Sequence, residues 1–324
     1  MTTGPVTRSD TGVRFIDWIA ARPRFSALAG ALAISFSGIF YRYAAVTPET
    51  GAFFRAVYGL PLLVVVAWLE YRRHGSMPAS AVRMLAVAGL FFAADLVFWH
   101  HTIEWVGAGL GTVIGNLQVV LVALLAWVLL GERPAIRTLL AIPIVLAGTA
   151  LISGVLGSGA YGRDPALGVL FGILTACCYA GYLLTLRRGG RDLRRPATPV
   201  AIATMATIVG VGVIGALDGG LDPVPSLPAH IWLVALGVLC QSAGSLFIGV
   251  SLPRLPAALT SIILLAQPVA AVILSRVLLA EAPSVTQYAG VALVIAGIAL
   301  ATVPLDRYLR RGDPADPAAS ATSP

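Results

Sequence analysis

Asp95 lies in the middle of a long apolar run, residues 84–104, where a charged group needs a chemical reason. A carboxylate at the centre of a membrane span costs about 2.5–3.5 kcal/mol on insertion scales. There it can bind a proton or an amine, or it can serve as the structural partner of a buried arginine. Both alternatives stay open at this point, and Asp95 is a candidate for proton coupling and for substrate binding.

Three glutamines, Gln118, Gln241 and Gln267, occupy comparable apolar runs. An amide has both a hydrogen-bond donor and an acceptor, so it can bind a polar substrate without carrying charge. The alternative is that each amide joins two helices, which is a common use of polar side chains in membranes. With Asp95, the full set of predicted substrate-binding residues is Gln118, Gln267, Gln241, Trp99, Asn116 and Tyr179.

Three arginines lie in or beside apolar runs, towards the ends that we predict to be external: Arg42, Arg55 and Arg276. A long basic side chain at such a position can extend to the membrane interface. It can also pair with an acid and close an external gate: for Arg276 the possible partners are Glu49, Glu281 and Glu104, of which Glu104 joins the three arginines as a candidate. These four residues are therefore the external gate candidates, with a simple interfacial position as the alternative.

His101 and Glu104 are three residues apart, a spacing that metal ligands on a helix can have. They point away from the Asp95 face, so we expect a solvated outer rim there, including His100, and no metal site or cofactor. Tyr41 and Tyr182 are expected among the aromatic residues of the membrane interface.

The elements that must position these residues are membrane helices. The chain is 58% hydrophobic and 11% charged, with a mean hydropathy of +0.87. A soluble domain is about 45–50% apolar and about 25% charged. A spanning helix needs about 20 mostly apolar residues, and the sequence predicts an all-α membrane protein with ten such runs. They are 26–45, 51–69, 84–104, 107–130, 138–155, 166–186, 198–217, 231–250, 257–279 and 286–304.

The net charge is +7, and arginine supplies all of the positive charge because the chain has no lysine. If both termini are cytoplasmic, eighteen of the 22 arginines fall on the inner side, as the positive-inside rule requires. Because the clusters flank apolar runs, they favour a plasma (inner) membrane over a nucleic-acid partner. The predicted tails are 1–25 and 305–324, both cytoplasmic, the second disordered.

The chain contains an internal repeat. Residues 107–152 align with 256–301 at a constant offset of 149, and sixteen of these 46 positions are identical. GNLQVVLVALLAWVLLGERP (115–134) and LLAQPVAAVILSRVLLAEAP (264–283) share a Gln, a Glu and a Pro at the same spacing. Five spans in each half, 26–155 and 166–304 with an external loop 156–165 between them, predict two inverted repeats. Such repeats are characteristic of secondary transporters, whose site lies at the midplane between the halves.

On these features the chain resembles the drug/metabolite transporter superfamily, and within it the EamA-type members. The resemblance is carried by the stretch ending LLGERP, its copy ending LLAEAP, and Phe54-Arg55. It implies a ten-helix carrier that works by alternating access on small organic metabolites, often outward. The family often has Pro after the polar position of the fourth helix, where this chain has Val119 but keeps Pro268. We therefore expect the fourth helix to run straight and the ninth to be kinked or unwound.

The favoured function is export of a small metabolite, such as an amino acid or a related compound, by a secondary transporter. The sequence has no GxxxxGK[ST] loop for ATP. A flippase for lipids or lipid-linked sugars on the same fold is the alternative, and an integral-membrane transferase is a weaker one. We predict that the protein is not an enzyme. The coupling ion, with protons among the candidates, and the oligomeric state, with a homodimer among the candidates, stay open.

Overall fold

The computed structural model describes residues 18–19, 21–131, 135–153, 159–192, 194–251, 254–255 and 257–302, and the elements in this part are helices. The first half holds α2 (Pro23–Ser35), α3 (Ser37–Ala44), α4 (Pro48–His74), α5 (Ala79–Val106), α6 (Ala108–Gly115), α7 (Gln118–Leu130) and α8 (Ile136–Ile152). The second half holds α9 (Pro165–Gly189), α10 (Thr198–Asp218), α11 (Leu227–Ala235), the π-helix η1 (Leu236–Gly244), α12 (Ser245–Ser251), α13 (Ala257–Leu278) and α14 (Val285–Thr302). Nearly all of the two predicted tails, and the Glu132–Pro134 corner, lie outside the described residues.

Within the described residues, six helical segments are long and apolar enough to cross a membrane: 23–44, 48–74, 79–106, 165–189, 198–218 and 227–251. Shorter apolar helices cover 108–122, 136–152, 266–278 and 285–301. Each of the ten expected runs overlaps one of these segments. The chain is therefore a multi-pass membrane protein, while the number of ten crossings stays a prediction.

Local sequence signals explain where the long helices begin. Thr47 caps α4 by accepting a hydrogen bond from the Thr50 backbone N–H at 3.4 Å, and Pro48 follows it. Asp164 caps α9 by accepting from the Leu167 N–H at 3.0 Å, and Pro165 follows it. A capping side chain with proline directly after it is a strong start signal, because proline lacks the N–H that the first turn cannot use.

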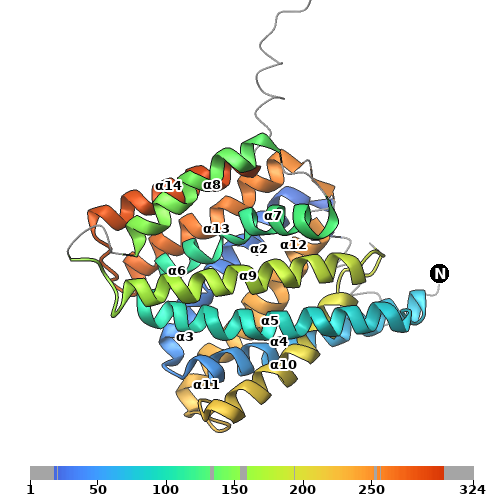
Figure 1. Cartoon of the computed structure of the whole chain (residues 1–324). Helices are drawn as coiled ribbons and strands as arrows, with labels where there is room; N and C mark the ends of the chain where they lie inside the picture. The colour runs from blue at the N-terminus through green and yellow to red at the C-terminus, as the bar shows by residue number, and fades with distance from the viewer. Residues whose placement is uncertain are drawn as a thin grey trace, which may run out of the picture.

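Two antiparallel helix pairs form the frame of the bundle (Figure 1). In the pair α5·α9, the Trp105 carbonyl accepts from the Asp164 N–H at 3.2 Å, and Gly189 packs on Leu85 at the far end. In the pair α8·α14, a Cβ on Gly290 would lie 2.6 Å from the Gly148 carbonyl oxygen. Small residues allow such close backbone approach in membranes.

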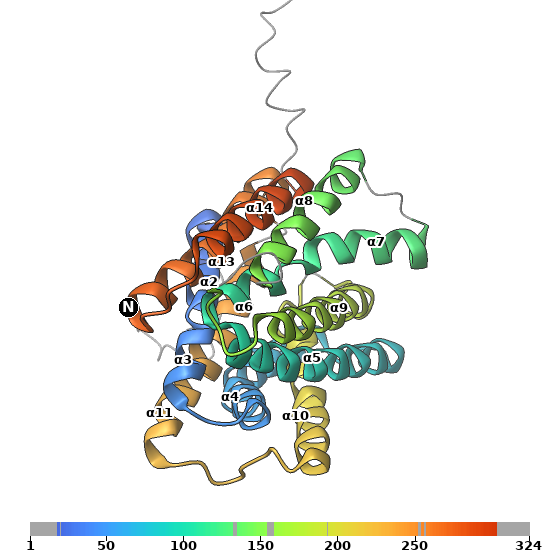
Figure 2. The ribbon, with the colours of Figure 1, turned by 60° about the vertical axis from the view of Figure 1, so that its left-hand side comes forward.

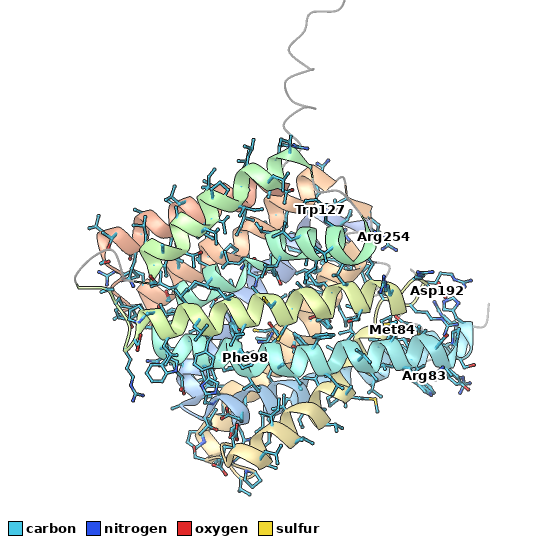
Figure 3. All side chains as sticks on the ribbon, in the orientation of Figure 1. Arg83, Met84, Phe98, Trp127, Asp192 and Arg254 are labelled. Atoms are coloured by element: carbon cyan, nitrogen blue, oxygen red, sulfur yellow. The ribbon has the colours of Figure 1, made fainter. Side chains whose placement is uncertain are left out.

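The two ends of the bundle differ in charge. Figure 3 shows Arg83, Asp192 and Arg254 at the same end, which we call the arginine-rich end. There Arg195 donates to the carbonyl of Gly75 at 2.8 Å and to that of His74. At the opposite end, the Asp222 N–H donates to the Thr50 hydroxyl at 2.8 Å. Side chain to backbone bonds therefore tie helices of the two halves together at both ends.

The fourth and ninth apolar runs differ from the expectation. The fourth is interrupted at Asn116 and Leu117 and forms the two successive helices α6 and α7 (Figure 2). The ninth is a single helix, α13, with Pro268 inside it. The expectation of a straight fourth helix was wrong, because the Leu117 N–H donates to the Ile114 carbonyl at 2.9 Å, an i−3 bond that ends α6, and the Asn116 side chain donates to the Thr112 carbonyl at 2.8 Å.

Candidate functional site

A cavity of about 350 Å³ lies between the two halves. Its wall includes residues of α2 to α7 from the first half and of α9, η1 and α12 to α14 from the second. The structure brings all seven predicted substrate residues to this wall: Asp95, Trp99, Asn116, Gln118, Tyr179, Gln241 and Gln267. Residues that are as much as 172 positions apart in the chain thus share one space.

Asp95 is the acidic residue of the cavity wall. It is 4% exposed, and no hydrogen bond or ion pair joins its carboxylate to the described part of the chain. Trp99, one helical turn further along α5, lines the same space. Buried carboxylates are normally paired or hydrogen-bonded. An unpaired one that faces a cavity can bind a proton or a cation.

An aromatic group lies on the wall beside Asp95. Phe92 precedes Asp95 by three residues on α5, and its ring stacks on that of Tyr182 with centroids 4.6 Å apart. Tyr179 lies 5.3 Å from Tyr182, centroid to centroid. The expectation that Tyr182 lies at the interface was wrong, since this residue is 7% exposed and lines the cavity.

The amides of the fourth and ninth runs reach the cavity from different local structures. Gln118 is the first residue of α7, whereas Gln267 lies inside α13 beside Pro268. Neither side chain hydrogen-bonds to another described residue, and both line the cavity. Asn116 also lines it, but its amide nitrogen already donates to the Thr112 carbonyl at 2.8 Å. Gln118 and Gln267 are therefore the amides that remain available to a ligand.

Arg55 lies in the cavity wall, away from the other gate candidates. Its Nε donates to the Oε1 of Gln241 at 3.1 Å, and its guanidinium carbon is 5.3 Å from the centroid of the Trp99 ring. The alternative of a simple interfacial position does not hold for Arg55, whereas its role in a gate stays a prediction. Arg55 is only the eighth residue of α4, but neighbouring helices cover it, and it is 8% exposed.

The remaining gate candidates lie at the end opposite the arginine-rich end. Arg42 and Glu104 line a second hollow, and Glu104 accepts from the Tyr41 hydroxyl at 3.0 Å. Arg276 donates to the Glu281 carbonyl at 3.1 Å. Tyr41, expected at the interface, is buried.

Glu281 connects the two halves at this end. Its two carboxylate oxygens accept from the backbone N–H groups of Ala108 at 2.6 Å and Gly109 at 3.1 Å, at the start of α6. A carboxylate at a helix N-terminus satisfies donors that have no partner within the helix and complements the helix dipole. Gly107, with φ of +94°, leaves room for it.

The histidine cluster is not a uniform solvated rim. His100 is fully buried, with Nδ1 2.6 Å from the Leu96 carbonyl oxygen, whereas His101 pairs with Glu49 at 2.9 Å. In the described part of the chain, no group of three His, Cys, Asp or Glu side chains could hold a metal ion.

Sequence reasoning missed several wall residues, among them Phe92 and Thr175, and it assigned Tyr182 to the interface. Phe92 lies three residues before Asp95, and Tyr182 lies three residues after Tyr179. Each therefore shares a helix face with a predicted site residue. Thr175 had no comparable signal. Its hydroxyl is buried in the cavity wall without a hydrogen-bond partner.

Several known proteins are similar to this chain in sequence or fold. The model of the EamA-like transporter family matches residues 23–154 and again residues 166–303. The uncharacterized transporter YxxF of Bacillus subtilis (strain 168) is 27% identical over 246 residues, which cover 75% of this chain and 77% of the relative. The uncharacterized transporter YwfM of the same organism is 24% identical over 260 residues, with 78% and 83% covered.

A solved structure described as "Crystal structure of protein" has the same fold. It aligns with a TM-score of 0.61 over 86% of this chain and 98% of its own length, at 21% identity. The family model covers most of the chain in two matched segments that correspond to its two halves. The chain therefore belongs to the EamA-like transporter family.

Proposed function

We propose that this transporter is a secondary active exporter of a small organic metabolite, such as an amino acid or a related compound. The observation that carries the proposal is the cavity between the halves, with the buried and unpaired Asp95 in its wall. A cavity of this size suits a small molecule, and an intramembrane carboxylate usually marks a substrate or proton pathway.

The proposed mechanism is alternating access by two inverted five-helix repeats, 26–155 and 166–304. The offset of 149 in the sequence and the two matches of the family model support the repeat. The cavity lies where such a fold places its site, between the repeats. Glu281 at the start of α6 is one contact that must break for the halves to separate at that end.

The orientation follows from charge. The arginine-rich end would face the cytoplasm, by the positive-inside rule, and both termini would lie there. The membrane would be the plasma (inner) membrane, and transport would be outward, as the resemblance to EamA-type carriers implies. Protons are the proposed coupling ion, because Asp95 can carry a proton in one state and release it in another.

The test is amino-acid transport in proteoliposomes with and without a pH gradient. Asp95→Asn should abolish the gradient-driven component, because the amide cannot carry the proton, while the protein still inserts and remains monodisperse. Asp218→Asn is the control, since Asp218 is an exposed aspartate outside the cavity. Wild-type gradient dependence in Asp95→Asn would rule out Asp95 as the coupling site. Movement of labelled lipid instead of amino acids would favour the flippase alternative.

A further inference from the structure

Arg55 is a buried cation without an anionic partner. It is 8% exposed, and no carboxylate of the described chain lies within 4.0 Å of its nitrogens. One of its five N–H donors, on Nε, is used by the neutral amide of Gln241. The terminal nitrogens have no hydrogen bond to a described residue. Because a buried charge without a partner is costly, it requires a reason.

Asp95 does not supply the missing anion. It lines the same cavity as Arg55, yet the two charged groups do not form an ion pair. Because both groups line the same cavity and form no ion pair, a ligand in that cavity can contact both. Each can then neutralise one charged group of the same molecule.

The chemistry of a guanidinium suits one type of anion in particular. Its planar N–H fork matches a carboxylate in two parallel hydrogen bonds. Here Gln241 holds Nε and the Trp99 ring lies 5.3 Å from the guanidinium carbon. The orientation of the fork is therefore set before a ligand arrives, and such preorganisation favours binding.

The position of Gln241 depends on the π-helix η1. The Ser242 hydroxyl donates to the Gly59 carbonyl, which brings η1 against α4 one turn beyond Arg55. A Cβ at Gly59 would lie 2.7 Å from the Gln241 Cγ, so the approach needs glycine. Short π-helices often occur at functional sites. Gln241 is accordingly a positioning residue for Arg55.

We propose that Arg55, positioned by Gln241, is a carboxylate-binding subsite, and that Asp95 with Phe92, Tyr179 and Tyr182 forms an amine-binding subsite in the same cavity. The inference rests on the proposed function and makes it more specific. The substrate is a small zwitterion that carries both groups, and neither an amine alone nor an acid alone satisfies the cavity. The aromatic rings beside Asp95 add cation–π attraction for the ammonium group.

The test uses matched probes on purified full-length protein. The phenylalanine series consists of L-phenylalanine, L-phenylalaninamide, phenethylamine and 3-phenylpropanoate, and a leucine series repeats it with an aliphatic side chain. Wild-type protein should bind the amino acid at least about tenfold more tightly than the amide, amine or acid, because each of these lacks one charge-assisted contact.

The variants should separate the two subsites. Arg55→Gln should weaken the binding of L-phenylalanine at least about tenfold and change the affinity for phenethylamine by no more than about twofold. Asp95→Asn should also weaken the binding of L-phenylalanine, but it should leave the affinity for 3-phenylpropanoate unchanged. Arg73→Gln is the control, because Arg73 is exposed in the last turn of the same helix, α4, and lies outside this cavity. If Arg55→Gln does not fold, Gln241→Leu provides the same reading, with a smaller loss that is confined to probes bearing a carboxylate.

Two outcomes would overturn the inference and are distinguishable. If Arg55→Gln or Gln241→Leu binds every probe as wild type does, Arg55 is not a carboxylate site, while transport that depends on Asp95 stands. If wild-type protein binds no member of either series, the inference fails. The proposed function fails as well only if a mixture of labelled amino acids shows no transport.

Discussion

Helix α13 runs without interruption from Ala257 to Leu278, whereas the matching stretch of the first half, 149 residues earlier, is divided into α6 and α7. The two stretches share the Gln, Glu and Pro of the internal repeat. Proline is the usual cause of a helix break, yet the copy that contains Pro268 is the continuous one. The break therefore comes from other contacts.

The contacts around Asn116 show how the first copy is broken. The Asn116 N–H is shared between the Thr112 and Val113 carbonyls, and the Leu117 N–H donates to the Ile114 carbonyl at 2.9 Å. This shortening from i−4 to i−3 bonds ends α6, and the Asn116 side chain takes the Thr112 carbonyl as well. Short polar side chains compete with helical bonding in this way. As a result, Gln118 reaches the cavity from a helix start and Gln267 from a helix interior.

The largest expected effect of a single change concerns the contact that holds the start of α6. Glu281→Gln replaces a carboxylate oxygen by an NH₂ group that faces a backbone N–H, so the free energy of unfolding should fall by about 2 kcal/mol. Thermal or chemical denaturation of the purified protein measures it. Glu104→Gln is the matched control, because its carboxylate accepts from the single Tyr41 hydroxyl and the loss should be smaller. Equal stability of both variants would show that α6 does not depend on Glu281.

A second prediction asks whether the two copies contribute equally to binding. Gln118→Ala and Gln267→Ala should each weaken amino-acid binding by about five- to tenfold, which corresponds to one hydrogen bond of about 1 kcal/mol. Asn116→Ala is the comparison, since its amide is already occupied within the chain. Loss of affinity in only one of the two glutamine variants would mean that the copies have separate roles.

The smallest effect concerns the residues that end the two stretches. Gly131 and its counterpart Ala280 are both left-handed, with φ of +70° and +53°. In this backbone conformation a residue with a Cβ destabilises the folded state by about 1–2 kcal/mol. Glycine destabilises the protein by only roughly 0.4–1 kcal/mol, through the greater entropy of its unfolded chain. Ala280→Gly should therefore raise the free energy of unfolding by about 1 kcal/mol or less, and Gly131→Ala should lower it. Denaturation midpoints with the same sign for both would contradict this account of the backbone.

Much of the fold could be predicted because a membrane imposes simple rules. Long apolar runs must be helical, since each backbone N–H and C=O needs a partner inside the segment. The same rules singled out Asp95 and the three glutamines, because a polar side chain in such a run is costly. Helical spacing from Asp95 and Tyr179 would also have indicated Phe92 and Tyr182, but we did not predict Phe92 and expected Tyr182 at the membrane interface.

The sequence by itself determined the class of the protein, its internal repeat and the polar residues that had to be accounted for, since these depend on composition and spacing. Only the tertiary structure decided which of them meet. Arg55 is the clearest case, because an arginine near a helix end can extend to water or be covered by neighbours, and only the packing of η1 on α4 settles which. The break at Asn116 is similar, because competing hydrogen bonds of nearly equal energy are decided by their surroundings.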